Sequence, residues 1–349
     1  MSDHLIQVDV PRRSLLLGRA VHLDAAERRR RAGVVACLVS AAGFGALPIF
    51  GKEAFEAGVG PLGLLWARFG LAAVVFWGLV TIVRPARPAA RWLLAGLLMG
   101  FAGYAVEAAL FFLALERIDA SLTELLLYAY PAMVTVAAVA RGRERLSGRL
   151  MGALLLASSG LVAVLAGGLA LGANLAGFAL GLSAAAVYAG YVLVGERVVA
   201  AVPPLLLAAL VSTGAAAAFT LAGLAGAPLG LPGTGSAWAV VGLIAVVGTV
   251  VPVAALFAGI ERVGAPTASI LSTAEPVVTV ALAMVFLGEA LSPIEVLGAL
   301  AVLGAVRLLQ ASPARNPLPA GGEVDGETSQ TPAPGEPATV GDEPEMACA

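Results

Sequence analysis

Residues 116–147 read ERIDASLTELLLYAYPAMVTVAAVARGRERLS, and residues 261–292 read ERVGAPTASILSTAEPVVTVALAMVFLGEALS. The two stretches align without gaps at a constant offset of 145, and 10 of their 32 positions are identical. The informative matches pair residue types that are scarce in this chain, namely Glu116/Glu261, Arg117/Arg262, Pro131/Pro276, Glu144/Glu289 and Ser147/Ser292. Upstream, Trp92 corresponds to Trp238 at an offset of 146. The chain therefore contains an internal repeat.

The composition around this repeat is that of a membrane protein. Of 349 residues, 59% are apolar and 13% are charged, and the mean hydropathy is +0.92. Soluble domains are about a quarter charged. This chain has too little charge to cover a water-soluble surface of its size, so we expect the lipid bilayer to be its solvent and partner.

Ten apolar stretches of spanning length follow one another between two polar ends. Each is a continuous run of about twenty residues, which indicates helices rather than the short alternating strands of a barrel. The spans are predicted at 33–51, 61–83, 92–115, 118–140, 148–168, 174–195, 205–226, 237–259, 264–287 and 293–310. Residues 1–32 form a polar N-terminal tail, and residues 311–349 have the composition of a disordered acidic tail.

The basic residues gather on one side of this predicted topology. Eighteen of the 21 lysines and arginines lie on the side of the N-terminus, and Lys52 and Arg117 lie on the other. The positive-inside rule then predicts a multi-pass protein of the cytoplasmic membrane with both termini in the cytoplasm. An even number of spans is required for that, which agrees with ten.

The repeat unit contains five spans, in residues 33–168 and again in residues 174–310. Because five is odd, the second copy must cross the membrane in the opposite sense to the first. We therefore predict an all-α membrane protein with ten transmembrane helices arranged as two inverted five-helix repeats. This architecture is typical of secondary transporters that work by alternating access. A duplication kept only for the stability of the fold is the alternative.

Several of these residues also resemble a known family. The stretch 265–309 is similar to the closing half of an EamA-type domain of the drug/metabolite transporter superfamily. The similarity rests on Pro276 in mid-span, Gly288-Glu289 at the span end, and Gly298 and Gly304 in the last span. Residues 120–165 repeat that pattern, except that Arg143 replaces the glycine, and residues 43–68 look like the opening of such a domain. The resemblance implies a ten-helix exporter or importer of metabolites, with a cavity lined by spans 1, 3, 4, 6, 8 and 9.

Four ionisable side chains are the clear cases of groups inside the bilayer: Arg68 in span 2, Glu107 in span 3, Glu124 in span 4 and Glu275 in span 9. A charge at the centre of a membrane helix costs about 2.5 kcal/mol or more, so such groups face the bundle interior and are candidates for function. Arg68 and Glu107 lie at matching depths and could form a buried ion pair, either as a static support or as part of a substrate site or gate. Glu124 could be the partner of Arg68 instead.

Glu275 has no basic residue of the bundle left to pair with, and it directly precedes Pro276, which kinks its helix. Desolvation favours the neutral form of such a carboxyl, as a proton carrier needs. It could instead bind an amine of the substrate, or remain a packed, protonated side chain. The repeat places Tyr130 and Pro131 at the equivalent position in the first half, so Pro131 marks a second predicted kink.

All five tyrosines fall in predicted spans 3, 4 and 6. Tyr104 lies three residues before Glu107 on the same helix face, and Tyr130, Tyr188 and Tyr191 are further candidates for the cavity wall. Tyr128 could be only an anchor at the membrane interface, and core packing is the alternative for each of the others. The four ionisable groups sum to a negative charge, which favours cationic or zwitterionic solutes, or proton coupling, over anions.

The leading hypothesis is a secondary transporter of a small organic solute, such as an amino acid, a metabolite or another cationic or zwitterionic compound. The alternative is a non-transporting sensor or interaction protein that acts through the acidic tail. We expect no enzyme, cofactor or metal, because two histidines and two scattered cysteines provide neither a catalytic set nor a metal site. A net charge of −2 speaks against nucleic acid. The pairs Gly96/Gly100, Gly148/Gly152 and Gly177/Gly181 could mark a homodimer interface, although packing within the bundle is the stronger expectation.

Overall fold

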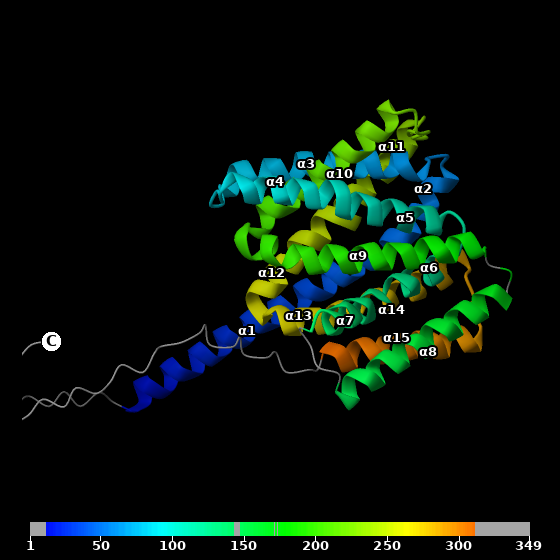
Figure 1. Ribbon diagram of the computed structural model, residues 1–349. Coiled ribbons are helices and arrows are strands. Elements are labelled where there is room, and N and C mark those ends of the chain that lie inside the picture. The colour runs from blue at the N-terminus through cyan, green and yellow to red at the C-terminus, as the bar shows by residue number, and fades with distance from the viewer. Residues whose placement is uncertain (1–11, 143–146, 171, 173, 311–349) are drawn as a thin grey trace, which may run out of the picture. The chain divides into compact units, whose positions relative to one another are not determined.

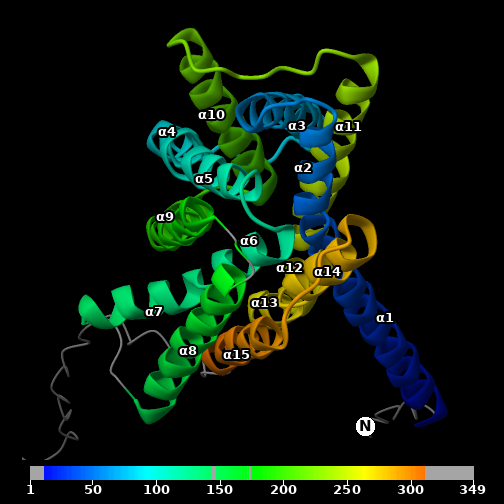
Figure 2. The same ribbon diagram turned by 90° about the vertical axis from the view of Figure 1, so that its right-hand side faces the viewer.

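A computed structural model describes residues 12–142, 147–170, 172 and 174–310 (Figures 1 and 2). Every regular element in that part of the chain is a helix. The predicted acidic tail at 311–349, the first eleven residues and the repeat residues Arg143 and Glu144 lie outside the described residues.

The segments follow one another along the chain, and three short ones are π-helical (η1–η3). In order they are α1 (Arg12–Gly45), α2 (Leu47–Glu56), α3 (Pro61–Val83), α4 (Ala90–Leu98), η1 (Met99–Tyr104), α5 (Ala105–Leu115), α6 (Ala120–Leu127), α7 (Tyr130–Ala140), α8 (Gly148–Ala170), α9 (Leu175–Ala201), α10 (Pro204–Leu224), α11 (Gly235–Ala245), η2 (Val246–Val250), α12 (Val251–Val263), α13 (Ala265–Ser272), α14 (Glu275–Leu282), η3 (Ala283–Leu287) and α15 (Pro293–Gln310).

Within the described residues, nine helical stretches are long and apolar enough to cross a membrane, and they coincide with the first nine predicted spans. The tenth predicted stretch forms α15, which is not among the nine. Residues 12–31 of the predicted polar N-terminal tail are helical and continuous with the first span in α1. Good helix formers and an ion pair between Glu27 and Arg31, one turn apart, account for this extension.

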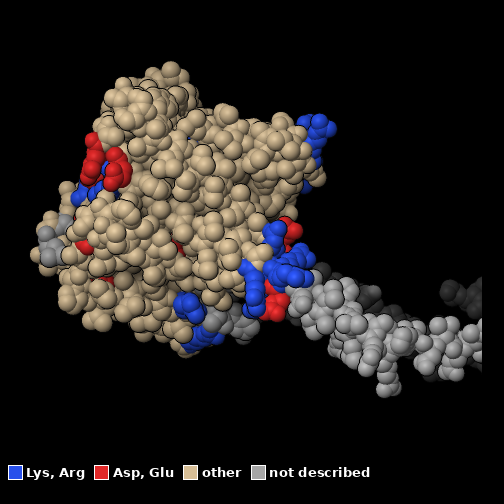
Figure 3. Space-filling model, turned by 180° about the vertical axis from the view of Figure 1, so that it is seen from behind, with Lys and Arg blue, Asp and Glu red and all other residues tan. Residues whose placement is uncertain are grey.

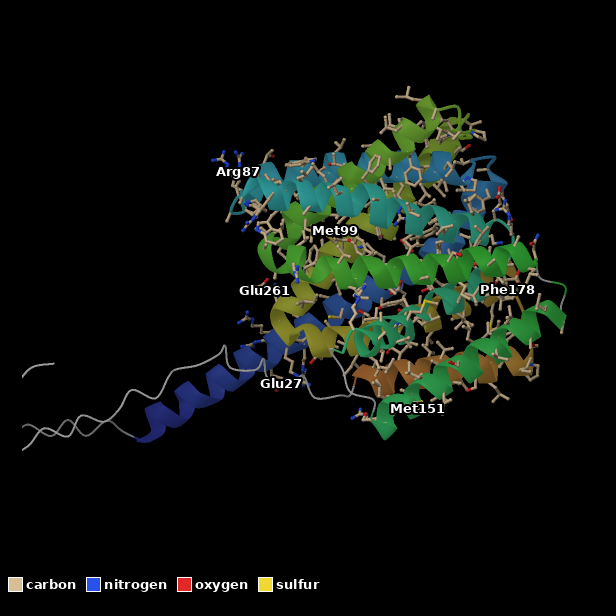
Figure 4. All side chains as sticks on the ribbon, viewed as in Figure 1. Glu27, Arg87, Met99, Met151, Phe178 and Glu261 are labelled. Carbon is tan, nitrogen blue, oxygen red and sulfur yellow. The ribbon has the colours of Figure 1, made fainter. Side chains whose placement is uncertain are left out.

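Large apolar side chains point outward along the helices, as bilayer contact requires. Val74 is 71% exposed, and Leu224 is 79% exposed. Figure 3 shows a face whose middle is largely uncharged, with charged side chains gathered towards its two ends. Arg87 and Glu261 lie at one end of the helices and Phe178 lies at the other (Figure 4). We call these the arginine end and the Lys52 end.

Two helices are broken at equivalent points of the repeat. Residues 128–129 separate α6 from α7, and residues 273–274 separate α13 from α14, an offset of 145. Each break is followed at once by a proline in the first turn of the next helix, Pro131 or Pro276. A proline lacks the N–H that would continue the helical bonding, so each break leaves backbone carbonyls free.

A second matched irregularity lies in the helices that pack around these breaks. η1 ends at Tyr104 and η2 ends at Val250, an offset of 146, which is also the offset between Trp92 and Trp238. A π-helical turn carries an extra residue and is frequent at functional sites. Both repeats therefore bend or widen their helices at corresponding depths.

Close helix contacts rest on small residues. A Cβ added to Gly160 of α8 would lie 2.7 Å from the carbonyl oxygen of Gly298 of α15, and one added to Gly298 would lie 2.6 Å from that of Gly160. Larger side chains there would push the two helices apart. Of the three predicted glycine pairs, two pack against other segments of the same chain, and Gly148/Gly152 face open space. A homodimer stays a prediction.

Candidate functional site

A cavity of about 400 Å³ lies where the two broken helices meet. Its wall contains polar and charged side chains from both repeats: Arg68, Tyr104, Glu107, Glu124, Tyr128, Tyr130, Tyr188, Ser272, Thr273 and Glu275. Seven of the eight predicted site residues are thus brought together, and the eighth, Tyr191, packs directly behind Tyr188. The wall draws on all six spans that the family resemblance implies, and Arg68 from span 2 and Val306 from α15 join them.

Arg68 of α3 is almost completely buried, with 1% exposure. Its Nε donates a hydrogen bond of 2.7 Å to Oγ1 of Thr249 in η2. Its guanidinium carbon also lies 4.9 Å from the ring centroid of Phe69 and 5.7 Å from that of Phe112. A hydroxyl acceptor and two aromatic faces therefore stabilise this cation.

This arrangement corrects the predicted ion pair. Among the described side chains, no Arg68 nitrogen lies within 4.0 Å of a carboxylate oxygen of Glu107 or Glu124. Thr249, which lies in the π-helical turn η2, takes the partner's place. Sequence reasoning missed Thr249, although it is the only hydroxyl residue within the predicted span 237–259.

Two buried carboxylates face the cavity from the first repeat. Glu107 of α5 is 6% exposed, and Glu124 of α6 is 2% exposed. In the part of the chain that the structure describes, Oε1 of Glu124 has no hydrogen-bond partner. A buried oxygen without a donor is costly, so this position favours a ligand that brings an N–H or O–H group.

The five tyrosines form one continuous cluster. Ring centroids are 5.8 Å apart for Tyr104 and Tyr191, 5.9 Å for Tyr191 and Tyr188, 4.6 Å for Tyr188 and Tyr130, and 6.2 Å for Tyr130 and Tyr128. The cluster draws residues from η1, α9, α7 and the break after α6. Tyr128, for which the sequence also allows an interface anchor, is only 7% exposed and belongs to the cavity wall.

Glu275 opens α14 and faces the same cavity. The hydroxyl of Tyr128 lies 3.1 Å from its Oε2 and 3.0 Å from the backbone oxygen of Ser272. These two contacts join the helix break of the first repeat to that of the second. They connect residues 144 and 147 positions apart, which no local sequence pattern could indicate.

At the Lys52 end, Glu289 of the second repeat bonds to the first repeat, and a lysine of the first repeat bonds beside it. The backbone N–H groups of Ala120 and Ser121, at the start of α6, donate to the two carboxylate oxygens of Glu289 at 2.6 and 3.0 Å. Lys52 Nζ donates to the carbonyl oxygen of Ile118 at 2.8 Å. We call Glu289, Lys52 and the first turn of α6 the clamp. Sequence reasoning used Glu289 only as a repeat marker and assigned no role to Lys52.

The clamp has its own electrostatics. Asp119, the residue before α6, makes no capping bond to that helix, so Glu289 supplies the negative charge that a helix N-terminus attracts. Burial, and then the neighbouring Glu289 carboxylate, raise the pKa of Asp119 above its ordinary value, while Lys52 acts in the opposite direction. The cavity wall meanwhile reaches Ile260 and Val306 near the arginine end.

Comparison with known proteins shows the same two-fold organisation. Residues 31–166 and residues 175–310 each match the EamA-like transporter family. The chain is 32% identical over 283 residues to a protein named "Uncharacterized transporter YcbK" from Bacillus subtilis (strain 168), covering 78% of this chain and 90% of that protein. A solved structure described only as "Crystal structure of protein" has a TM-score of 0.56 at 18% identity, covers 80% of this chain and 97% of that one, and supports the fold alone.

Proposed function

Because the chain belongs to the EamA-like transporter family, we propose that it is a secondary transporter for a small cationic or zwitterionic organic solute. The family makes it a multi-pass membrane protein, and its relatives point to transport rather than catalysis. The solute crosses the cytoplasmic membrane by alternating access. Glu275 carries the proton whose gradient drives accumulation.

The observation that carries this proposal is the charge of the cavity. Three acidic side chains, Glu107, Glu124 and Glu275, share a space of about 400 Å³ with one guanidinium, Arg68, so acidic groups outnumber the cation even when one of them carries a proton. The phenol rings around them offer both hydrogen bonds and negative ring faces. An ammonium group is stabilised in such surroundings, whereas an anion would meet an excess of like charge.

Alternating access is supported by the matched irregularities of the two repeats. Both broken helices contribute to the cavity, and two similar halves can exchange conformations so that the site faces each side in turn. The clamp bridges the Lys52 end, while the cavity wall extends towards the arginine end. If the arginine end is cytoplasmic, as the positive-inside rule predicts, this conformation faces inward.

The proposed topology has ten transmembrane helices in two inverted repeats, with both termini in the cytoplasm. α15 would be the tenth span and the last helix of the second repeat. It packs against α8, the last helix of the first repeat, through Gly160 and Gly298. The equivalent ends of the two repeats would therefore lie side by side.

Transport assays on purified protein in proteoliposomes test this function. A thermal-shift screen of amines, amino acids and related zwitterions first identifies a solute that stabilises the protein. Uptake of that solute is then measured with and without a pH gradient, for the wild type and for Glu275→Gln. The wild type should accumulate the solute when a gradient is imposed. The variant should still exchange solute across the membrane but lose gradient-driven accumulation.

Glu261→Gln is the matched control, because the same change is made to an exposed glutamate whose nearest cation, Arg29, is 3.9 Å away at the surface. This control should accumulate solute like the wild type. A loss of solute affinity in Glu275→Gln, independent of the gradient, would assign Glu275 to the substrate instead of the proton. Unchanged uptake under all conditions would remove it from the mechanism.

A further inference from the structure

The hydroxyl of Tyr128 stands between two acceptors of the opposite repeat. Tyr128 lies in the break between α6 and α7, whereas the acceptors are the backbone oxygen of Ser272 and the side chain of Glu275 on either side of the break between α13 and α14. The distances, 3.0 and 3.1 Å, are nearly equal. The Tyr128 ring is buried, whereas Ser272 and Glu275 are half-buried and border the cavity.

The oxygen of Ser272 is available because of Pro276. In an unbroken helix, the N–H of residue 276 would donate to the carbonyl of residue 272, and proline has no N–H. Tyr128 supplies the missing donor from the other repeat. The break of the second repeat is thus stabilised by a side chain of the first.

A phenol has one proton and can donate it once, while its oxygen can also accept. If Glu275 is protonated, its O–H donates to the Tyr128 oxygen and the Tyr128 O–H donates to Ser272, so that all three groups are satisfied. If Glu275 is ionised, the Tyr128 proton must serve two acceptors, and one of them is left short of a donor. Even in a half-buried position, an acceptor that lacks a full hydrogen bond makes this arrangement less favourable than the protonated one.

From this geometry we infer that Glu275 holds its proton in the conformation seen here, and that Tyr128 is the positioning residue that links this proton to the helix break of the second repeat. When Glu275 gives its proton to water in the cavity, the Tyr128 O–H turns from Ser272 to the new carboxylate. The carbonyl of Ser272 then loses its donor, and the junction of α13 and α14 is free to change its angle. This inference rests on the proposed transport function and adds the residue that couples proton release to movement.

The charges around Glu275 agree with a neutral carboxyl. From α1 and α2, only the apolar residues Phe44, Leu47 and Pro48 reach the described cavity wall, and α12 and α13 add no charged group to it. The remaining titratable groups that face Glu275 across the cavity are Arg68, Tyr104, Glu107, Glu124 and Tyr130, together with Tyr188. Arg68 is the one cation in the described part of this wall, and it bonds to Thr249, so no cation pairs with Glu275 there; a low-polarity site of this kind disfavours the charged form of a carboxyl.

Infrared difference spectroscopy tests the protonation directly, without any substrate. The wild type should show a carboxylic-acid C=O band that disappears on raising the pH and that is missing in Glu275→Gln. Tyr128→Phe should keep this band at a shifted frequency, because the acid has lost its hydrogen-bond partner. Tyr191→Phe, which removes a phenol oxygen elsewhere in the same cluster, is the control and should leave the band in place.

The coupling is tested by a distance measurement on the same variants. Spin labels are placed on cysteines introduced at the exposed residues Ile270 of α13 and Val199 of α9, with Cys348 replaced by serine and the fully buried Cys37 left alone. In the wild type, the label distance should change over the pH range in which the acid band disappears. In Tyr128→Phe, the band should still titrate while the distance no longer follows it.

Pro276→Ala provides a second variant if Tyr128→Phe does not fold. It restores the backbone donor for Ser272, so the distance should again stop following the proton. If Glu275→Gln keeps every acid band of the wild type, Glu275 does not hold the proton in this conformation, which overturns the inference. A distance that still follows pH in Tyr128→Phe or in Pro276→Ala overturns the coupling role. Neither the infrared nor the distance measurement requires transport of a solute. A negative result in either can therefore be distinguished from a failure of the transport proposal.

Discussion

The clamp makes a quantitative prediction about which side of the protein is closed. Glu289→Ala removes the acceptor for the N–H groups of Ala120 and Ser121 at the start of α6. These bonds join the two repeats at the Lys52 end, so they stabilise the conformation in which the repeats meet there. We expect the variant to open this end more often while its helices remain folded.

The size of the effect follows from the two bonds that are lost. A hydrogen bond to a charged group contributes about 1.5–3 kcal/mol in a protected site. Replacement of a helix N-cap costs about 0.5–2 kcal/mol, because water can reach the freed N–H groups. Glu289 is half-buried, so we take ~2 kcal/mol, which corresponds to a roughly 30-fold shift in the equilibrium. Glu289→Gln keeps one acceptor oxygen and should lose ~1 kcal/mol, or about fivefold.

Thiol labelling from each side of the membrane measures this shift. Leu127→Cys places a thiol in the cavity wall, and Cys37 is buried and does not interfere. With a membrane-impermeant reagent on the side of the Lys52 end, labelling should become about 30-fold faster in Glu289→Ala, in line with the equilibrium shift. Glu261→Ala, at an exposed glutamate, is the control and should label like the parent. Equal rates in Glu289→Ala and in the control would refute the clamp.

Three further predictions concern stability and topology. Thr249→Val removes the hydrogen bond to the buried Arg68 and should cost about 1.5–3 kcal/mol of unfolding free energy, seen as a lower Tm in detergent. Thr249→Ser keeps the hydroxyl and should keep the Tm of the wild type. Equal Tm values for the two variants would mean that the bond is dispensable. Gly298→Val should overpack the contact of α15 with α8, which costs about 1–3 kcal/mol of unfolding free energy and should be seen as a lower Tm. An unchanged Tm would contradict that contact. A reporter fused after residue 311 should be cytoplasmic and one inserted at residue 232 should be outside, and a cytoplasmic signal at 232 would exclude the inverted repeat.

The helical spans and the breaks within them can be read from the sequence because their causes are local. Continuous apolar runs specify membrane helices, and the matches at Pro131 and Pro276 locate both interruptions to within a few residues. An ionisable side chain in an apolar run also faces the bundle interior, because contact with lipid would be energetically costly. For that reason the sequence pattern alone assigns Arg68, Glu107, Glu124 and Glu275 to the interior of one bundle.

Which partner each of these groups finds was decided by the tertiary structure. Arg68 bonds to Thr249 rather than to a carboxylate, because the π-turn of η2 brings a hydroxyl within 2.7 Å. Tyr128 meets Ser272 and Glu275, and Glu289 caps α6, across 144 to 169 positions of chain. Hydropathy and helix periodicity carry no information about such separations. The sequence by itself therefore determined which residues are forced into the membrane interior. Only the packing of the two repeats decided which of these residues touch. A hydrogen bond requires its atoms to be placed to within an ångström, and helix packing alone sets those positions.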